Sequence, residues 1–283
     1  MQNTSKHCQI TNQSNNVIVS IDNPWATASI SLFGAHVYSF IPKQDARERL
    51  WMSPMASLEG DTAIRGGTPI CWPWFSNQFP EGQTGLPAHG YARSSLWSLD
   101  QISDNQNNET ELLFKLESNG LPGFPYKAKL SFKVIIGQHL TMSLTTSNID
   151  NKSFKITAAL HTYFKIENLD NTQLTGISGT YRDKTRNFDN FEAPAVYVFE
   201  GETDRIHETR ASDVTIVEPD AETFIKTDGH DSLVVWNPGA KLVTSIANIP
   251  NAEFKQFVCV EAAITTPLTI APGNSHTLTQ LVF

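Results

Sequence analysis

The chain has 283 residues, of which 40% are apolar and 18% are charged. This composition supports a large buried core and excludes a disordered chain. The formal net charge is −8, so the overall field does not attract nucleic acid or an anionic membrane surface. We therefore expect neither as a partner, and any bound anion must be held by a local cluster of cations.

The cysteines and the N-terminal segment bear on location. Cys8, Cys71 and Cys259 are the three cysteines, and no pair has C-x-x-C spacing, which favours a reducing compartment over a disulfide framework or a cysteine-built zinc site. Residues 1–16 are polar, so we expect no signal peptide. The apolar runs are far shorter than the roughly 20 residues of a membrane helix. We expect a cytoplasmic protein.

Strand patterns dominate the chain. Residues 28–41 alternate in part, and Gly34 breaks their register, as at a bulge or a close backbone approach. Residues 100–111 are polar and are interpreted as a loop. Further strands are expected at residues 112–116, 126–136, 140–146, 154–166, 233–236, 242–246, 257–263 and 278–283.

No long segment carries a helical apolar stripe, and no helical crossovers separate the strands, so a parallel sheet is disfavoured. We predict an all-β fold, a large antiparallel β-sandwich with few short helices, as a single domain over residues 1–283.

The clearest alternation covers residues 154–166. One face carries apolar side chains, and the other carries His161 and Tyr163 among mostly polar ones. His161 is therefore either exposed and idle or part of a cleft on the sheet, where an imidazole suits general acid chemistry. Glu261 lies in an apolar strand, FVCVEAA; it either faces solvent or has a partner or a purpose.

Two loops combine arginine with aromatic residues. Residues 65–76 read RGGTPICWPWFS, and residues 89–97 read HGYARSSLW. Arg65 and Arg93 are either solvated surface arginines or an anion clamp, because a guanidinium matches phosphate oxygens. His89 by itself is typical of a packed loop histidine. Together the loops favour one shared site for an anionic sugar.

Several common sites are missing from the sequence. It contains no Walker A motif, no Rossmann G-x-G-x-x-G, no H-E-x-x-H and no G-x-S-x-G. No metal-ligand spacing is visible. We therefore expect neither a nucleotide cofactor nor a metal.

As an ordered set, eight segments resemble the aldose 1-epimerase superfamily, and specifically its hexose-6-phosphate mutarotase (glucose-6-phosphate 1-epimerase) branch. The segments span nearly the whole chain and are GAHVYSF at 34–40, RGGTPICWPWF at 65–75, LPAHGYARSSLW at 86–97, LHTYFKI at 160–166, ETD at 202–204, VVWNPG at 234–239, VCVEAA at 258–263 and LTIAPG at 268–273.

The resemblance implies a galactose mutarotase-like super-sandwich that interconverts the α and β anomers of a hexose 6-phosphate, glucose 6-phosphate foremost. It implies that His161 is the general acid and Glu261 the general base. It assigns Arg65 and Arg93 to the sugar phosphate. It also implies that Asp204 hydrogen-bonds sugar hydroxyls and that His89 borders the site. We expect a monomer whose partner is the small sugar phosphate.

The chain departs from the family pattern at two places. Ala88 stands where many relatives carry Gln, and Ala262-Ala263 stand where relatives often have Pro-Gly. Three alternatives remain at this stage: an epimerase of free sugars such as galactose, a non-catalytic carbohydrate-binding β-sandwich, and a regulatory protein that binds sugar phosphate. The two arginines disfavour the first, and the retained His161 and Glu261 disfavour the second.

Overall fold

The computed structural model describes residues 2–283. Its chain forms three sheets, and apart from the short parallel pair β1–β7 the strand pairs named below are antiparallel. The largest sheet has nine strands, which run in space as β1 (Gln2–Asn3), β7 (Ser98–Asp104), β8 (Thr110–Leu121), β9 (Phe124–Ile136), β10 (Leu140–Asn148), β21 (Ser275–Val282), β18 (Ala221–Asp228), β17 (Asp213–Glu218) and β13 (Gln173–Thr175).

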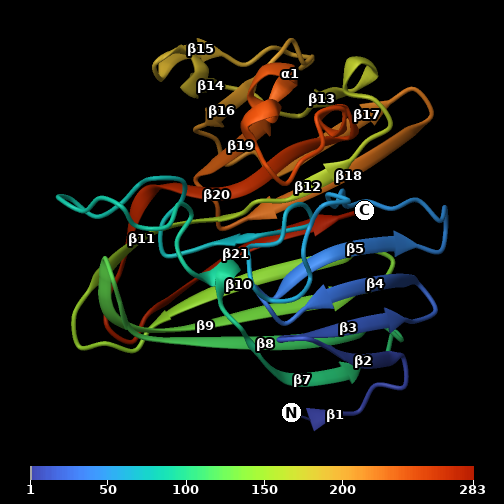
Figure 1. Cartoon of the computed structure of the whole chain (residues 1–283), viewed down its shortest axis with the longest axis vertical. Helices are drawn as coiled ribbons and strands as arrows, with labels where there is room; N and C mark the ends of the chain where they lie inside the picture. The colour runs from blue at the N-terminus through green and yellow to red at the C-terminus, as the bar shows by residue number, and fades with distance from the viewer. Residues whose placement is uncertain (1) are drawn as a thin grey trace.

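A second sheet of eight strands faces the first, and in Figure 1 its strands β16, β19 and β20 lie above the green strands β8 and β9. Strand β12 pairs with β20 beside β11. The strands are β15 (Asp189–Glu192), β14 (Thr180–Asp183), β16 (Thr203–His207), β19 (Ser232–Asn237), β20 (Phe257–Ile270), β11 (Phe154–Leu160), β12 (Tyr163–Lys165) and β6 (Ile70–Cys71).

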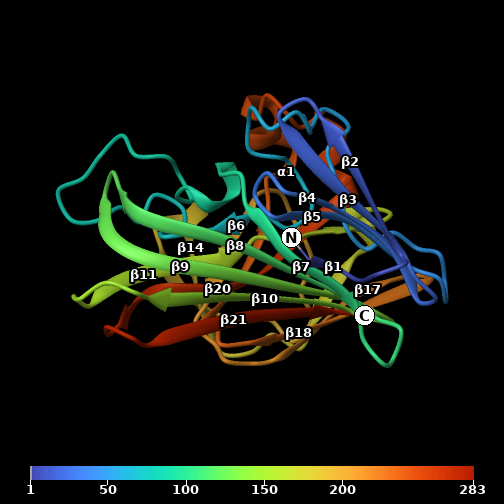
Figure 2. The same cartoon turned by 90° about the horizontal axis from the view of Figure 1, so that it is seen from below.

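The N-terminal part of the chain forms a four-stranded antiparallel sheet, drawn in blue beside the large sheet in Figure 2. Asn23 joins it to the large sheet, because its Nδ2 donates to the carbonyl of Ile136 at 2.8 Å. The strands are β2 (Cys8–Gln13), β3 (Asn16–Asp22), β4 (Ala26–Ser31) and β5 (His36–Pro42).

Helices in residues 2–283 are short. Helix α1 (Gly239–Leu242) runs directly into a 3-10 turn. The 3-10 helices are η1 (Ala92–Ser94), η2 (Leu169–Asn171), η3 (Lys184–Arg186), η4 (Val243–Ser245) and η5 (Glu253–Gln256). None of the helices in this part of the chain is long and apolar enough to cross a membrane. The predicted all-β antiparallel architecture is confirmed.

Three local predictions are wrong. Residues 242–245 are helical (the end of α1 and η4) and Ile246 follows the helix, so the segment is not a strand; Val243 and Ile246 belong to the apolar cluster of Trp51 and Phe257. Residues 100–111 are not one loop but the ends of β7 and β8 with a turn between them. Residues 154–166 form two strands, and His161 lies in the break between them.

The predicted two faces of residues 154–166 are confirmed. Leu160 and Phe164 belong to the main core between the sheets, whereas Tyr163 packs in a separate cluster on the other side. The neighbouring strand β20 alternates in the same way, with Val260 in the core. The side chains between these core residues along β11, β12 and β20 therefore lie on the outer face of the eight-stranded sheet.

One polar residue interrupts the core face of β21. Gln280 is fully buried between Leu278 and Val282. Its Nε2 donates to the carbonyl of Val260 at 2.9 Å, and its Oε1 accepts from the hydroxyl of Thr162 at 2.5 Å. The side chain thereby joins the two facing sheets through satisfied buried hydrogen bonds.

We predict that Gln280→Leu, which keeps the side-chain size, lowers the free energy of unfolding by about 1–3 kcal/mol. The buried carbonyl of Val260 loses its amide donor, and the Thr162 hydroxyl keeps only Thr68 Oγ1, at 3.2 Å, as a partner. Urea denaturation followed by tryptophan fluorescence measures the change. Gln101→Leu, on an exposed position of β7, is the control and should shift stability by less than about 0.5 kcal/mol. Equal effects of the two substitutions would contradict the prediction.

Candidate active site

The register between β20 and its neighbours brings His161 next to Glu261. Leu160 pairs with Ala262, and the same register continues across the strand break. One further residue along, His161 stands opposite Glu261, and His161 Nδ1 lies 3.3 Å from Glu261 Oε1. The structure thus brings together the two residues predicted as an acid–base pair.

Both side chains are withdrawn from water. Glu261 is 1% exposed and His161 is 7% exposed. Within residues 2–283, neither His161 Nδ1 nor Glu261 Oε2 has a hydrogen-bond partner, even though the two groups are in ion-pair range. Because buried polar atoms in folded proteins are normally paired, this pair has bonding capacity left for a ligand.

Burial moves the two titrations in opposite directions. Desolvation, and then the charge of Asp204, raises the pKa of Glu261 well above its usual value. Desolvation, and then His89 and the arginines Arg93 and Arg65, lowers the pKa of His161 well below its usual value. The pKa of each group therefore lies outside its ordinary range, as is typical of residues that exchange protons.

Aromatic rings form the walls of the cavity around this pair, whose volume is about 140 Å³. Tyr163 stacks on His161 with ring centroids 5.0 Å apart and planes at 8°. Trp236 meets the same imidazole edge-on at 5.9 Å, and Phe75 closes another side. These faces fix the imidazole and offer a flat apolar surface to a ring-shaped ligand.

Arg65 reaches the cavity from the segment before β6. Its Nη1 donates to the hydroxyl of Tyr163 at 2.9 Å, and its Nε donates to Asn248 Oδ1 at 3.0 Å. Gly67 makes the approach possible: its φ is +57°, and a Cβ there would lie 2.5 Å from the carbonyl of Val37. The guanidinium is thus held in one plane before any ligand binds.

Arg93 enters the same cavity from η1. Its Nη2 donates to the backbone carbonyl of Ala88 at 2.8 Å. Gly90 sets the path of this loop, because a Cβ there would lie 2.1 Å from the carbonyl of Trp72 at a φ of +72°. Only the backbone of Ala88 makes this contact with Arg93, and the Ala88 residue itself is exposed.

His89 lines the cavity in a strained backbone conformation, with φ of 64°. Its Nδ1 accepts from the backbone N–H of Ser76 at 3.2 Å, so the hydrogen of the neutral ring sits on Nε2. Burial, reinforced by Arg93, lowers its pKa to about 3. His89 is therefore a neutral hydrogen-bond donor beside His161, 5.3 Å away between ring centroids.

Asp204 lies on β16 directly opposite Trp236. Its Oδ2 is 2.6 Å from Lys184 Nζ, and both side chains line the cavity. All six residues predicted from the sequence (Arg65, His89, Arg93, His161, Asp204 and Glu261) therefore surround one cavity.

The sequence reasoning assigned no role to Lys184, Trp236 or Asn248. Trp236 stands in the segment VVWNPG, and its alternation with Val235 on β19 is the signal that could have placed it on the outer face. Lys184 is one of several basic residues in YRDKTR, and Asn248 lies in a loop. No local pattern marks either of them.

The remaining arginines lie elsewhere, as their absence from the aromatic loops predicts. Arg210 lines a separate hollow with His230 and His276. The others pair with carboxylates outside the cavity: Arg47 with Glu218, Arg49 with Asp45, Arg182 with Glu208, and Arg186 and Arg205 with Asp183.

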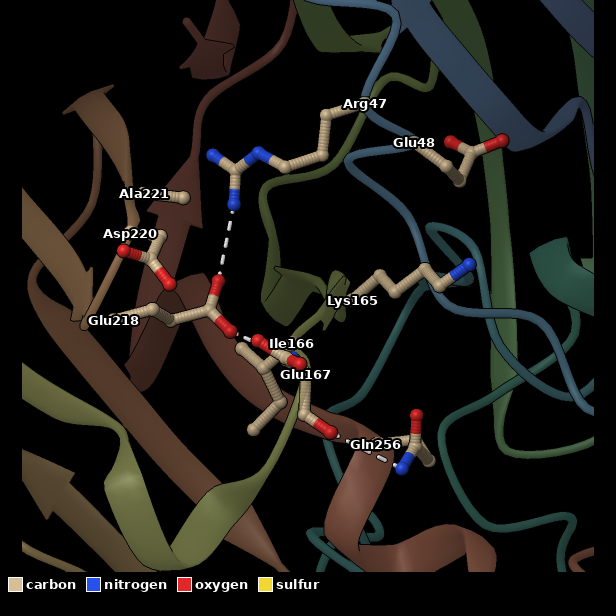
Figure 3. A pocket seen from close by; sticks show the side chains of 9 residues that line it. All are labelled: Arg47, Glu48, Lys165, Ile166, Glu167, Glu218, Asp220, Ala221 and Gln256. Atoms are coloured by element: carbon tan, nitrogen blue, oxygen red, sulfur yellow. Dashed lines mark hydrogen bonds and ion pairs between the residues drawn. The ribbon is translucent and has the colours of Figure 1, made fainter.

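Figure 3 shows another hollow, of about 270 Å³, beside the end of β12. The Glu218 side chain is only 6% exposed, and both of its oxygens are engaged. One accepts from the backbone N–H of Glu167 at 2.6 Å, and the other pairs with Arg47 at 3.0 Å. The buried charge of this hollow is already compensated within the chain, in contrast to the His161–Glu261 cavity.

The fold and the cavity define an all-β sandwich protein whose cavity holds a buried histidine–glutamate pair, aromatic walls and the cations Arg65, Arg93 and Lys184. The family description aldose 1-epimerase matches residues 17–282. The chain belongs to the aldose 1-epimerase family, as its sequence resemblance predicted.

Relatives and solved structures agree with this assignment. Proteins from Escherichia coli strain K12 and from Cenchrus ciliaris, both named "Putative glucose-6-phosphate 1-epimerase", are 32% and 30% identical over 252 and 262 residues. Each match covers 87% of this chain, with 82% and 78% of the respective relative. The crystal structure of a "putative mutarotase (YeaD)" from Salmonella typhimurium is 28% identical, with a TM-score of 0.90 over 100% of this chain and 95% of that one.

We predict that Glu261→Gln stabilises the protein by about 1–2 kcal/mol at pH 8 and less at pH 5. The raised pKa of Glu261 means that the folded state binds the proton more tightly than the unfolded chain. Stability is therefore lost as pH rises above the usual value of 4.5, and glutamine removes that loss. Denaturant unfolding at both pH values measures it, with the exposed Glu202→Gln as control. If Glu261→Gln were no more stable than wild type at pH 8, the pKa of Glu261 would not be raised in the folded protein.

Proposed function

We propose that the protein interconverts the α and β anomers of hexose 6-phosphates, with glucose 6-phosphate as the principal substrate. The observation that carries the proposal is one cavity that holds the His161–Glu261 pair together with Arg65 and Arg93. The names of the relatives agree with it.

The chemistry needs one proton acceptor and one proton donor. Burial favours the neutral forms of both groups in the ligand-free site, so the reactive state is the one in which a proton has passed from Glu261 to His161. In that state the Glu261 carboxylate takes the proton from the C1 hydroxyl, while protonated His161 gives a proton to the ring oxygen O5. The C1–O5 bond breaks as the C1=O double bond forms. The open chain rotates about C1–C2, and the steps run in reverse to close the ring on the other face. Each proton-transfer partner contributes about 10²–10⁴-fold.

The 3.3 Å separation of the two groups supports this division of labour. The hydroxyl on C1 and the ring oxygen are both bonded to the same carbon, so a single small region must hold both the donor and the acceptor. A neutral His89 beside His161 adds a fixed hydrogen-bond donor to that region.

The phosphate is assigned to Arg65 and Arg93. The overall charge of −8 repels a sugar phosphate at long range, so affinity must come from short contacts. Asn248 and Tyr163 hold the Arg65 guanidinium in place before binding, which reduces the entropy that is lost when phosphate binds. A neutral sugar has no dianion to exploit these fixed donors, and this disfavours the free-sugar alternative.

We predict that Glu261→Gln and His161→Ala each reduce kcat for glucose 6-phosphate by at least about 100-fold. Exchange spectroscopy by NMR measures anomer interconversion directly. Circular dichroism confirms that the fold is retained. If either variant kept a rate within a factor of three of wild type, that residue would not be the acid or the base.

We predict that Arg65→Ala and Arg93→Ala each raise KM for glucose 6-phosphate by roughly tenfold to a hundredfold, because a charge-assisted hydrogen bond contributes about 1.5–3 kcal/mol. The kcat/KM for free glucose should change much less. Arg210→Ala, at an exposed residue that lines a separate hollow, is the matched control. Equal losses with both sugars would mean that the arginines hold the ring or the loop, and the free-sugar epimerase would be the better assignment.

A further inference from the structure

Lys184 is the cation in the cavity to which the proposed function gives no task. It begins η3, directly after β14, and its side chain lies 2.6 Å from Asp204 on β16. The two side chains are only 24% and 16% exposed, respectively. This pair is therefore partly shielded from water, where charges interact more strongly than at an open surface.

Hydrogen bonds of the preceding residue, Asp183, fix the turn that carries Lys184. The buried Asp183 caps η3, because its Oδ1 accepts from the backbone N–H of Thr185 at 2.9 Å. Its other oxygen accepts from Arg205 Nε at 3.3 Å. Lys184 is thus presented to the cavity by a well-bonded corner rather than by a free loop.

Lys184 offsets the electrostatic repulsion between two carboxylates of the cavity. Asp204 and Glu261 line one small space, and two ionised carboxylates in one site oppose each other. The charge of Asp204 raises the pKa of Glu261, whereas Lys184 and Arg93 lower it. The titratable and charged groups that line this cavity around Glu261 are His161 from the break between β11 and β12, Tyr163 from β12, Asp204 from β16, Lys184 from η3, Arg93 from η1, and Arg65 and His89 from the loops.

We propose that Lys184 is a positioning residue for the acid–base pair: by holding Asp204 in an ion pair, it orients that carboxylate for the sugar hydroxyls and cancels its charge beside Glu261. Lys184 does not touch the reacting atoms. This inference rests on the proposed function for its catalytic consequence, but its electrostatic part concerns the ligand-free protein alone.

The pH dependence of kcat/KM tests the proposal. The profile reports the apparent pKa values of the coupled His161–Glu261 pair in the free enzyme, and the ¹³C titration described below identifies the limb that follows Glu261. In Lys184→Met the charge of Asp204 loses its ion-pair partner, so the Glu261 limb moves to higher pH. We expect kcat/KM for glucose 6-phosphate to fall by about tenfold at pH 6, because a smaller fraction of Glu261 is ionised there, and to fall less above the pKa of Glu261. The ionisation of the substrate phosphate is common to all variants and cancels in the comparison.

Three further variants separate charge from structure. Lys184→Arg keeps the cation and should keep the limb where it is in wild type. Asp204→Asn should move the limb to lower pH, and Lys184→Met combined with Asp204→Asn should return it toward the wild-type position. Lys241→Met, an exposed lysine on α1, should change nothing. A Glu261 limb that stays at its wild-type position in Lys184→Met would overturn the proposal.

A measurement without substrate keeps this test independent of the proposed function. ¹³C NMR of the glutamate carboxyl groups follows the Glu261 titration in the ligand-free protein, with Glu261→Gln to assign the signal. Lys184→Met should raise that pKa, and Asp204→Asn should lower it. If wild type does not interconvert the anomers of glucose 6-phosphate and yet these shifts appear, the proposed function fails and the role of Lys184 beside Glu261 stands. If the anomers interconvert and the pKa shifts are missing, the proposed function stands and the role of Lys184 beside Glu261 fails.

Discussion

The geometry of the acid–base site depends on one buried amide in the core behind it. Gln280 is fully enclosed on β21, and its two bonds go to Thr162 and to the carbonyl of Val260. These residues are the chain neighbours of His161 and Glu261. A side chain from one sheet therefore ties together the strand break that carries the histidine and the strand that carries the carboxylate. A fully satisfied buried network of this kind specifies one arrangement.

The alternation of side chains along β20 places Glu261 on the outer face of the sheet, where the cavity lies. Val260 and Ala262 point into the core, so Glu261 between them must point to the outer face. Neighbouring strands present Trp236 and Tyr163 on that face, and loops cover it from above. The result is a carboxylate almost as buried as a core residue but next to a cavity. Burying the Glu261 carboxylate lowers the stability of the fold and gives no packing advantage in return, which is a reason to expect a functional role for it.

Much of this could be predicted from the sequence, and the failures have physical causes. The two faces of residues 154–166 follow from side-chain alternation alone, which correctly placed His161 on the outer face. Alternation cannot show that a strand breaks, because the break at His161 depends on bonds to other segments, such as the backbone N–H of His161 to Pro69. Residues 242–246 are too short for their apolar pattern to separate strand from helix. Lys184 was missed because its partner is 20 positions away in the chain and the pairing of β14 with β16 creates the contact.

The charges in the cavity also explain how a phosphate could affect the chemistry beyond binding. Arg93 and Arg65 both lower the pKa of His161. On the proposed function, a dianion held between them offsets this field and makes protonated His161, the acid form, easier to maintain. The same dianion also offsets the help that Arg93 gives to ionised Glu261. Lys184, engaged with Asp204, is then the cation left to keep the base ionised. Binding of phosphate and the division of protons within the pair are therefore coupled, and a free sugar cannot supply that coupling.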